Sequence, residues 1–480
     1  QPPGRYSRPG GFLKQELDTM SINRQVIQEI FPEPGQAVFD RIEDRYLSDT
    51  LGRRKGTAEA LVFPASARQV SQLLRYAHDN QIPVTPRGAG TNLVGSTVPL
   101  KGGIILDLSR MNRILELDRD TMTVTVEPGI LLKDLQEFVE AEGLFYPPDP
   151  GEKESSIGGN ISTDAGGMRA VKYGVTRDYV RGLEVVLADG TILQAGGKNV
   201  KDASGLSLKN LIIGSEGTLA VITRCILKLI PKPEASVSVL VPYPDLKTGI
   251  RSVLAILQAD ANPTAVEFME RKVVELGERF SGVRYPCPEA GSFILLTFDG
   301  HASEVAANAE RVRRVALEHG AMDYIVLRDA AQAADIWRVR GALVKAVEAV
   351  SEQEPVDIVV PISRTADFTA FINQLEQTTG MQMVSFGHAG DGNVHLCVVR
   401  GDRDEETWQR ELTANMEKAY AKAYELGGVA SGEHGIGVSK RHYFLHETAE
   451  ANLRVMNRIK DAVDPRHILN DGKSYILREQ

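Results

Sequence analysis

The stretch PPDPGEKESSIGGNISTDAGGMRAVKYG, residues 147–174, is rich in small and hydroxyl-bearing residues. It carries glycine pairs at 158–159 and 166–167, with small hydroxyl and amide side chains between them. Glycine lets the backbone approach a ligand closely and present its N–H groups. Because a segment with almost no bulky side chains fills a core poorly, we expect it to line a large polar ligand.

Two further glycine-rich segments flank this stretch in the sequence. PRGAGTNLVG covers residues 86–95, and GSEGTLAVIT covers residues 214–223. PRGAGTNLVG is not a Walker loop, because GK[ST] is missing, and its glycine spacing is not that of the Rossmann fingerprint. One glycine-rich turn alone is compatible with a plain structural loop, but the three segments together favour a nucleotide-like ligand.

The composition narrows the class of protein. A chain of 480 residues is too long for one compact core, so we expect two or three domains. The net charge of −9 argues against a nucleic-acid surface but permits small anionic substrates. The three cysteines, at 225, 287 and 397, form no CxxC signature, so we expect no cysteine-ligated iron–sulfur cluster and a reducing cytoplasm.

Two terminal and membrane features are also predicted. The chain has no apolar run of about 18 residues, so we expect no membrane span. Residues 1–12, QPPGRYSRPGGF, lack the apolar core of a signal peptide and are expected to be a flexible tail left by processing or expression.

The residue patterns predict an α+β chain. Apolar residues recur at helical spacing in 65–80, whereas 121–129 alternates with period two. GLEVVLADGTILQAG, residues 182–196, indicates a hairpin that turns at Asp189-Gly190. Beyond residue 236, strands such as SFILLTF and helices such as SEVAANAERVRRVALEHG predict helices packed on an antiparallel sheet.

A proline-rich break, PKPEA, marks a candidate domain boundary at residues 231–235. The predicted parts are an N-terminal tail and helix at 1–44, a first domain at 45–235, a second domain at 236–425 and a C-terminal segment at 426–480.

Two short motifs concentrate polar chemistry. GHAGDGNVH, residues 387–395, places His388 and His395 at the ends of a glycine-containing turn between two predicted strands. SGEHGIG, further along the chain, adds Glu433 and His434. Two imidazoles and a carboxylate suit a zinc-like ion and leave coordination positions open for a substrate. The alternative is a turn that these side chains only tie with hydrogen bonds.

Together, the three glycine-rich segments and YGVTRDYVRGLEVVLADG resemble the FAD-binding domain of the vanillyl-alcohol-oxidase superfamily. GHAGDGNVH and SGEHGIG narrow the resemblance to FAD-linked D-2-hydroxy-acid dehydrogenases, which include D-lactate dehydrogenases, glycolate oxidase catalytic subunits and D-2-hydroxyglutarate dehydrogenases. The resemblance covers roughly residues 45–475. It implies a two-part FAD-binding domain, a substrate (cap) domain with helices on an antiparallel sheet, and a C-terminal segment that returns to the FAD site.

The resemblance also implies which residues contact the flavin. The first glycine loop wraps the pyrophosphate, the quoted stretch lines the flavin, and the third segment lies on the adenine side. The implied cofactor-binding residues are Arg87, Gly88, Ala89, Gly90, Thr91, Asn92, Gly95, Ser96, Pro150, Ser156, Ile157, Gly158, Gly159, Ser162, Gly166, Gly167, Glu216, Gly217, Ile222 and Asn470. Asn470 stands in LNDGK, where Asp471 replaces the usual proline of the family. The first loop has no histidine for a covalent flavin bond, so we predict non-covalent FAD.

For the reaction, the resemblance makes His388, His395 and Glu433 ligands of a divalent metal, with His388 also close to the substrate. Zn²⁺, Mn²⁺ and Fe²⁺ are all chemically possible ions. His434 takes the proton from the substrate hydroxyl, whose pKa the metal lowers, and the hydride passes to the flavin. The product is a 2-keto acid.

Binding of the substrate carboxylate is assigned to Arg340 by the same resemblance, because a guanidinium offers a bidentate fork. Arg338 competes for this role from a different helix face, and Lys440 either serves the anion or is exposed. No second cationic residue matches a distal carboxylate. D-lactate and glycolate are therefore favoured over D-2-hydroxyglutarate.

The expected protein is a dehydrogenase of small D-2-hydroxy acids that passes electrons to an external acceptor. An electron-transferring flavoprotein, a separate iron–sulfur subunit, a quinone or a cytochrome would fit. We expect a cytoplasmic protein, with peripheral membrane contact through a partner and a homo-oligomer both possible. Two alternatives stay open, a sugar or lactone oxidase of the same superfamily and a flavin-bearing electron-transfer subunit without catalysis.

Overall fold

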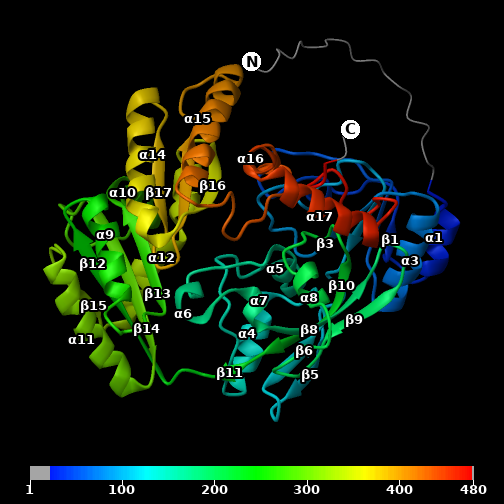
Figure 1. The fold of residues 1–480 in the computed structure, drawn as a ribbon, viewed down its shortest axis with the longest axis horizontal. Helices are drawn as coiled ribbons and strands as arrows, with labels where there is room; N and C mark the ends of the chain where they lie inside the picture. Colours follow the sequence, from blue (N-terminus) through cyan, green and yellow to red (C-terminus); the bar gives the residue numbers. More distant parts are fainter. Residues whose placement is uncertain (1–21, 478–480) are drawn as a thin grey trace.

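A computed structural model describes residues 22–477 of the chain (Figure 1). The tail predicted at 1–12 lies outside the described residues. The chain builds two units, which Figure 1 shows on the right and on the left. The first unit comprises residues 22–231 and 450–477, and the second comprises residues 235–425.

The first unit begins with a four-stranded sheet in the order β1-β2-β4-β3, in which β2, β4 and β3 are parallel. Helix α3 covers this sheet because Val70, Leu73, Leu74 and Ala77 face it from one side of the helix. Ser66 starts α3 by accepting a hydrogen bond from the backbone N–H of Gln69. The elements are α1 (Arg24–Ile30), β1 (Ala37–Val38), α2 (Asp44–Leu47), β2 (Ala60–Val62), α3 (Ala67–Asp79), β3 (Val84–Arg87) and β4 (Ile104–Asp107).

A five-stranded antiparallel sheet, in the order β5-β6-β10-β8-β9, completes the first unit. The predicted hairpin is confirmed as β8 and β9, with Gly190 at a φ of +83° in the turn. The elements are β5 (Ile114–Asp118), β6 (Thr123–Val126), α4 (Leu132–Ala141), β7 (Leu144–Phe145), α5 (Ile157–Thr163), α6 (Ala170–Tyr173), α7 (Thr176–Tyr179), β8 (Val180–Val186), β9 (Ile192–Gly196), α8 (Leu208–Ile212), β10 (Val221–Lys228) and β11 (Ile230–Pro231).

The second unit is built on a seven-stranded antiparallel sheet in the order β15-β12-β14-β13-β17-β18-β16, which confirms the predicted helices on an antiparallel sheet. Its strands are β12 (Ala235–Tyr243), β13 (Ala265–Glu270), β14 (Ser292–Gly300), β15 (Ile325–Leu327), β16 (Gln353–Val359), β17 (Met383–His388) and β18 (Asn393–Val399). Its helices are α9 (Leu246–Leu257), α10 (Arg271–Ser281), α11 (Ala302–Glu318), α12 (Ala330–Gly341), α13 (Leu343–Glu348), the 3₁₀ turn η1 (Ile362–Arg364), α14 (Thr365–Thr379) and α15 (Glu405–Glu425).

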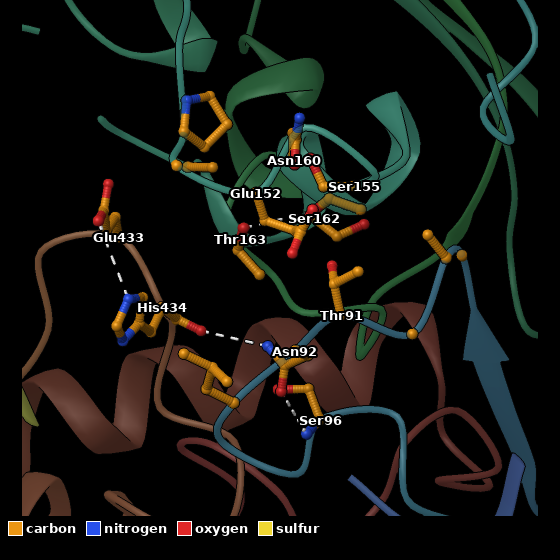
Figure 2. A pocket seen from close by; sticks show the side chains of 18 of the residues that line it. Thr91, Asn92, Ser96, Glu152, Ser155, Asn160, Ser162, Thr163, Glu433 and His434 are labelled. Atoms are coloured by element: carbon orange, nitrogen blue, oxygen red, sulfur yellow. Dashed lines mark hydrogen bonds and ion pairs between the residues drawn. The ribbon is translucent and has the colours of Figure 1, made fainter. Parts of the chain in front are cut away.

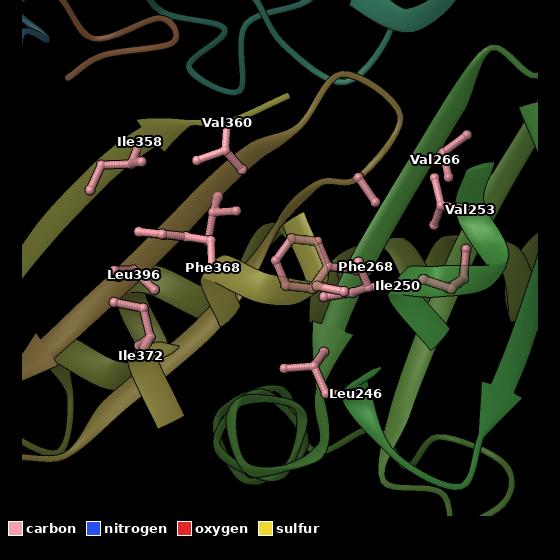
Figure 3. Close-up of a cluster of buried hydrophobic side chains, with 14 of the residues drawn as sticks. Leu246, Ile250, Val253, Val266, Phe268, Ile358, Val360, Phe368, Ile372 and Leu396 are labelled. Atoms are coloured by element: carbon pink, nitrogen blue, oxygen red, sulfur yellow. The ribbon is translucent and has the colours of Figure 1, made fainter. Parts of the chain in front are cut away.

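Helices cover both faces of this sheet. One face packs against α9, α11, α14 and α15 in the larger core of the unit, where Phe268 and Leu396 from the sheet meet Phe368 from α14 (Figure 3). The other face packs against α10, α12 and α13. Because successive residues of a strand point to opposite faces, each strand contributes to both cores.

The C-terminal residues return to the first unit. Helix α16 (Arg441–Glu447) packs against α15 of the second unit, where the rings of Tyr443 and Tyr420 stack 4.5 Å apart, and α17 (Glu450–Val463) lies over the first unit in Figure 1. Beyond α17, Val84 of β3 donates a backbone hydrogen bond to Ile468 and accepts one from Asn470. Within the described residues, no helix combines the length and the apolar character that a membrane crossing requires.

Candidate active site

A cavity of about 580 Å³ is lined by residues from both units. Its walls combine the glycine-rich segments of the first unit with strands β16, β17 and β18 and helices α12 and α13 of the second. The residues predicted from the sequence that line it are Arg87, Gly88, Ala89, Gly90, Thr91, Asn92, Ser96, Pro150, Ser156, Gly158, Gly159, Ser162, Glu216, Gly217, Ile222, Arg340, His388, His395, Glu433, His434 and Asn470.

Ser156 explains why the first glycine loop and the start of α5 lie together. Its hydroxyl oxygen accepts hydrogen bonds from Gly159 N and Ala89 N, each at 3.3 Å. A side chain at position 88 would collide with this hydroxyl, so only glycine fits there. Figure 2 shows the hydroxyl and amide side chains of this wall, including Thr91, Asn160 and Ser162, around one space. The backbone N–H groups and missing side chains fit a dinucleotide such as FAD.

Five of the predicted cofactor or substrate residues are not part of the cavity lining that residues 22–477 form. These are Gly95, Ile157, Gly166, Gly167 and Lys440. Ile157 is fully buried in the core of the first unit, and a Cβ on Gly166 would lie 3.2 Å from Glu433 Oε2. Gly166 therefore leaves room for the Glu433 carboxylate.

His388, His395 and Glu433 converge although they come from two distant segments. His388 ends β17 and His395 lies in β18, so the four-residue turn between these strands brings the two rings together. The Nε2 atoms of the two histidines are 3.3 Å apart, and Glu433 Oε1 lies 3.6 Å from His388 Nε2 and 3.5 Å from His395 Nε2. One ligand atom from each of the three residues lies within 4.8 Å of the others.

The chemistry of this set fits a divalent cation. Glu433 Oε2 is buried and has no hydrogen-bond partner among the described residues. An unpaired buried carboxylate oxygen is costly unless something else satisfies it. Two imidazole nitrogens and a carboxylate form a common ligand set for zinc and similar ions.

Glu267, which the sequence reasoning missed, orients His388. Its Oε1 lies 2.7 Å from His388 Nδ1, and its Oε2 accepts hydrogen bonds from Arg340 Nε at 3.0 Å and Nη2 at 2.5 Å. A carboxylate that holds the outer nitrogen of a ligand histidine fixes its tautomer and orientation. The signal in the sequence is the carboxylate of Glu267 between apolar residues of the strand AVEFME, because a fully buried charge needs a partner.

Burial and neighbouring charges together set the pKa values of Glu433, His395 and His388. Burial opposes the ionisation of Glu433, yet the hydrogen bond from His388 and the nearby imidazoles lower its pKa to about 2. Burial lowers the pKa of His395 to about 3. For His388, the charges of Glu267 and Glu433 outweigh burial and raise the pKa well above its usual range. Near pH 7, Glu433 is therefore ionised and His395 neutral, which are the forms that bind a cation, whereas His388 holds a proton that a bound cation would displace.

His434 lines the cavity next to this set. Its Nε2 lies 3.9 Å from Glu433 Oε1, and its ring stacks on that of His395 with centroids 5.7 Å apart. Its carbonyl accepts a hydrogen bond of 3.3 Å from Asn92 Nδ2, which joins the first glycine loop to the 431–437 loop (Figure 2). An imidazole between the converging groups and the glycine-rich wall is placed to exchange a proton with a bound molecule.

Asp357 is a second carboxylate that the sequence reasoning missed, inside the apolar strand VDIVVP. It is fully buried on β16 and accepts hydrogen bonds from the backbone N–H groups of Gly432, Glu433 and His434 at 3.1 Å. Burial favours its neutral form, but Lys440, 3.0 Å away, and the nearby imidazoles lower its pKa well below the usual range. Lys440 therefore neutralises Asp357 behind the 431–437 loop and is not exposed.

Glu216, predicted to lie on the adenine side of the flavin, lines the cavity and directs its carboxylate to the 431–437 loop. Its Oε1 accepts a hydrogen bond from Ile436 N at 3.0 Å, and its Oε2 accepts hydrogen bonds from Gly437 N at 2.8 Å and Ser96 Oγ at 2.5 Å. Its backbone carbonyl accepts a hydrogen bond of 2.7 Å from Asn470 Nδ2. Glu216 thus joins the third glycine-rich segment to the 431–437 loop and to the C-terminal residues.

The arginine alternatives differ in position. Arg340 is buried and lines the cavity, whereas Arg338 is largely exposed and pairs with Asp335 at 2.8 Å. Glu267 accepts hydrogen bonds from Nε and Nη2 of the Arg340 guanidinium. Nη1 is therefore the nitrogen that has no partner among the described residues. The bidentate fork expected from the sequence is therefore already partly used within the protein.

The seven-stranded sheet presents polar side chains to one part of the cavity and apolar side chains to the next part. Phe386 on β17 pairs with His395 on β18, which in turn pairs with Asp357 on β16. The next row on the same face pairs Cys397 with Pro355. Phe386, Cys397 and Pro355 all line the cavity, and sequence reasoning could not identify them because strand register is set by tertiary pairing.

Two known protein families match consecutive parts of the chain. Residues 58–196 match the family described as "FAD binding domain", and residues 232–474 match "FAD linked oxidases, C-terminal domain". A D-lactate dehydrogenase of Anaerostipes hadrus is 43% identical over 444 residues, which cover 91% of this chain and 94% of that protein. The glycolate oxidase subunit GlcD of Bacillus subtilis is 36% identical over 468 residues, which cover 95% of this chain and 97% of that protein.

More distant similarities agree with the fold. A D-2-hydroxyglutarate dehydrogenase of Stutzerimonas stutzeri is 30% identical over 455 residues, covering 92% of this chain and 97% of that protein. The crystal structure of p-cresol methylhydroxylase matches with a TM-score of 0.78 at 17% identity, covering 94% of this chain and 96% of that one. The 4-ethylphenol oxidase of Gulosibacter chungangensis matches with a TM-score of 0.74 at 20% identity, covering 94% and 97%. At such identities the structural matches indicate the fold alone.

Proposed function

The chain belongs to the FAD-linked D-2-hydroxy-acid dehydrogenase family, and we propose that it oxidises D-lactate or glycolate to the 2-keto acid with the help of a divalent metal. As a member of this family it is an FAD-linked oxidoreductase of 2-hydroxy acids. When bound, FAD supplies the two-electron acceptor for this oxidation. The observation that carries the proposal is the convergence of His388, His395 and Glu433 on one wall of a cavity whose other wall is glycine-rich.

His388, His395 and Glu433 would hold the cation. The unpaired Glu433 Oε2 and the Glu267 carboxylate behind His388 both support this role. A divalent cation held there would supply Lewis-acid polarisation of the substrate hydroxyl. Three protein ligands leave further positions open for substrate oxygens.

His434 would accept the hydroxyl proton. Oxidation of a 2-hydroxy acid removes a proton from the hydroxyl and a hydride from Cα, which leaves a carbonyl. An imidazole with access to the cavity is suited to accept this proton. Asn92 holds the His434 carbonyl toward the first glycine loop, which keeps the ring between the two walls.

Arg340 would bind the substrate carboxylate through Nη1. Its guanidinium lies 5.1 Å from the Phe386 ring centroid, and Glu267 fixes its opposite side. The charge of Glu267 reduces the net positive charge available to an anion, so the cation would share the task of holding the carboxylate.

A small or apolar substituent on the substrate is supported by the wall beyond Arg340. The apolar residues of this wall are Val344, Pro355, Phe386 and Cys397. Lys345 and Glu348 also line the cavity, but they are exposed on α13 and opposite in charge. A second carboxylate would meet no unpaired buried cation on this wall, so we rank D-2-hydroxyglutarate below D-lactate and glycolate.

Electrons would leave through an external acceptor. The three cysteines are free thiols, and two of them are buried in different units, so the described residues offer no iron–sulfur site of their own. An electron-transferring flavoprotein, an iron–sulfur subunit, a quinone or a cytochrome would each fit this requirement.

Anaerobic flavin bleaching tests the proposed reaction. The FAD-loaded protein is mixed in a stopped-flow spectrometer with D-lactate, glycolate, D-2-hydroxyglutarate or L-lactate, and its metal content is measured by elemental analysis. We expect D-lactate or glycolate to reduce the flavin fastest and close to one divalent ion per chain. Reduction by dithionite but by no hydroxy acid would contradict the enzymatic proposal, and activity in metal-free protein would contradict the role of the cation.

A further inference from the structure

The 431–437 loop, SGEHGIG, carries the metal ligand Glu433 and the base His434 of the proposed function, on which this inference rests. The loop belongs to no helix or strand and contains three glycines, two of them with left-handed backbone (Gly435 at φ +83° and Gly437 at φ +49°). A glycine-rich segment has many alternative conformations. Contacts from outside the loop must therefore fix the positions of Glu433 and His434.

Asp357, on strand β16 of the second unit, holds the first half of the loop. Three successive backbone N–H groups, from Gly432 to His434, and the Ser431 hydroxyl at 2.7 Å all donate to its carboxylate. Lys440 and Asn393, whose Nδ2 lies 2.6 Å from Oδ1, complete its surroundings. Convergent N–H groups around one anion fix a backbone conformation strongly.

Glu216, in the first unit, holds the second half. Besides Ile436 N and Gly437 N, its carboxylate accepts hydrogen bonds from Ser96 Oγ and, at 3.1 Å, Ser474 Oγ. Glu216 itself has a φ of +53°, which is uncommon for a residue other than glycine. Strained backbone of this kind persists where the surroundings impose it.

We propose that Asp357 and Glu216 act as a pair of positioning residues, one from each unit, that fix Glu433 and His434 at the active site. Neither carboxylate needs to contact the substrate for this role. Five backbone N–H groups of the loop, at positions 432, 433, 434, 436 and 437, donate to these two side chains. Gly435 lies between the two halves, where a Cβ would be 2.9 Å from Glu216 Cδ.

The contacts of Glu216 and Asn92 link the proposed FAD site to the proposed metal site. Glu216 binds both the loop and Ser96, which lines the cavity, and Asn92 of the same glycine loop binds the His434 carbonyl. FAD that orders the glycine loop should therefore also order the 431–437 loop and tighten metal binding. By linkage, the metal should tighten FAD binding by the same factor, which we expect to be about 5-fold or more.

Metal affinity of the Asp357→Asn and Glu216→Gln variants tests the inference without requiring turnover. Both changes keep the shape of the side chain and remove its charge. The dissociation constant for Zn²⁺ is measured in FAD-loaded and FAD-free protein by competition with a chelator. We expect Asp357→Asn to weaken Zn²⁺ binding by about 10- to 100-fold. For Glu216→Gln, the difference in Zn²⁺ affinity between FAD-loaded and FAD-free protein should shrink, because only the contact of Asn92 with the His434 carbonyl still links the two loops.

Glu278→Gln provides the matched control. Glu278 is a buried carboxylate of α10 that accepts a backbone hydrogen bond from Tyr285 N at 2.9 Å, and it does not line the cavity. It reports the general cost of removing a buried charge in the second unit. We expect this variant to retain wild-type Zn²⁺ affinity and the wild-type rate of flavin reduction by D-lactate.

Milder variants keep the test decisive if a carboxylate variant fails to fold. Ser431→Ala and Ser474→Ala each remove one hydroxyl donor to Asp357 or Glu216 and should weaken Zn²⁺ binding by less than the carboxylate variants do. Suppose that wild-type protein binds Zn²⁺ and is reduced by D-lactate. If both carboxylate variants and both serine variants then bind Zn²⁺ as tightly as the wild type, the positioning role is overturned. If Glu278→Gln loses as much affinity as Asp357→Asn, it is overturned as well. If wild-type protein neither binds Zn²⁺ or Mn²⁺ nor is reduced, the proposed function itself fails and the inference falls with it.

Discussion

At the scale of single residues, the groups of the site depend on their neighbours, as when the Glu267 carboxylate holds both His388 and Arg340. His388, His395, Glu433 and His434 were identified because imidazoles and carboxylates in glycine-rich turns serve no purpose in a core. The sequence reasoning missed Glu267 because a carboxylate between apolar residues of a strand does not indicate which residue it pairs with. Its pairing with His388 and Arg340 depends on which strands and helices become neighbours.

His434 provides the residue-scale prediction. Replacing it with asparagine should leave FAD and metal bound, because neither the Glu433 carboxylate nor the glycine loops lose a strong contact. Loss of the general base should slow flavin reduction by D-lactate by roughly 10²-fold or more. Stopped-flow reduction and elemental analysis measure the two effects separately, and near-normal reduction would remove His434 from this role.

At the scale of elements, turns decide where the functional groups lie. The sequence correctly predicted that GHAGDGNVH joins two strands, now seen as β17 and β18. Gly392 ends this turn with a φ of +81°, and a Cβ there would collide with the carbonyl oxygen of Val360. Two features thus require glycine at position 392. The left-handed backbone can be predicted from the glycine in the sequence, but the close approach to the residue after β16 cannot.

Replacing Gly392 with alanine tests this account of the turn. The left-handed backbone should cost about 1–2 kcal/mol in the free energy of unfolding, and the collision should add to that cost and displace His388 and His395. Thermal unfolding and Zn²⁺ content are the measurements. Gly401→Ala is the matched control, because Gly401 is also left-handed but its Cβ would meet nothing closer than Arg403 Nη1 at 3.8 Å. Equal effects of the two substitutions would contradict the role of the collision.

At the scale of the whole molecule, the C-terminal residues close the site. Residues 468–470 pair with β3, and Asn470 Nδ2 donates to the carbonyls of Ser96 and Glu216. Lys473 is buried beside them, with Nζ 2.8 Å from the Ser96 carbonyl and 2.7 Å from Asn470 Oδ1. A segment more than 370 residues away in the sequence from Ser96 thereby completes the first glycine loop.

Lys473 makes the stability of this closure depend on pH. Burial lowers its pKa from 10.5 to about 7. Between these values the unfolded chain holds a proton that the folded chain lacks, so the free energy of unfolding rises with pH, by at most about 1.4 kcal/mol per pH unit from this group. The stabilisation is complete above pH 10.5 and is lost as pH falls to about 7.

Lys473→Met should remove this dependence. The thermal unfolding midpoints of the FAD-loaded wild type and variant are measured at pH 7.5 and 9.5. The midpoint of the wild type, relative to that of the variant, should be higher at pH 9.5 than at pH 7.5. Lys418→Met, at an exposed position of α15, controls for loss of a positive charge. A difference that does not change with pH would show that Lys473 does not titrate in this range.

FAD release is a second prediction at this scale. The histidines that line the cavity belong to the metal and base segments, and the first glycine loop has none, so we expect every FAD molecule to leave on denaturation. Filtration after acid or heat measures the released flavin. Free FAD at about 100 times its dissociation constant should stabilise the folded protein by about 2.7 kcal/mol. Flavin that stays with the chain on denaturing electrophoresis would contradict the prediction.

The sequence by itself determined the glycine-rich cradle, the two-strand turn with its histidines, the helices on an antiparallel sheet and the family. These features are local, because backbone conformation, hydrophobic period and ligand-type side chains are written in neighbouring residues. Only the tertiary structure decided that Glu267 supports His388, that Asp357 holds the 431–437 loop, and that Lys440 is buried behind this loop. Such contacts depend on strand register and on the packing of two units, which are set by pairings between residues far apart in the chain.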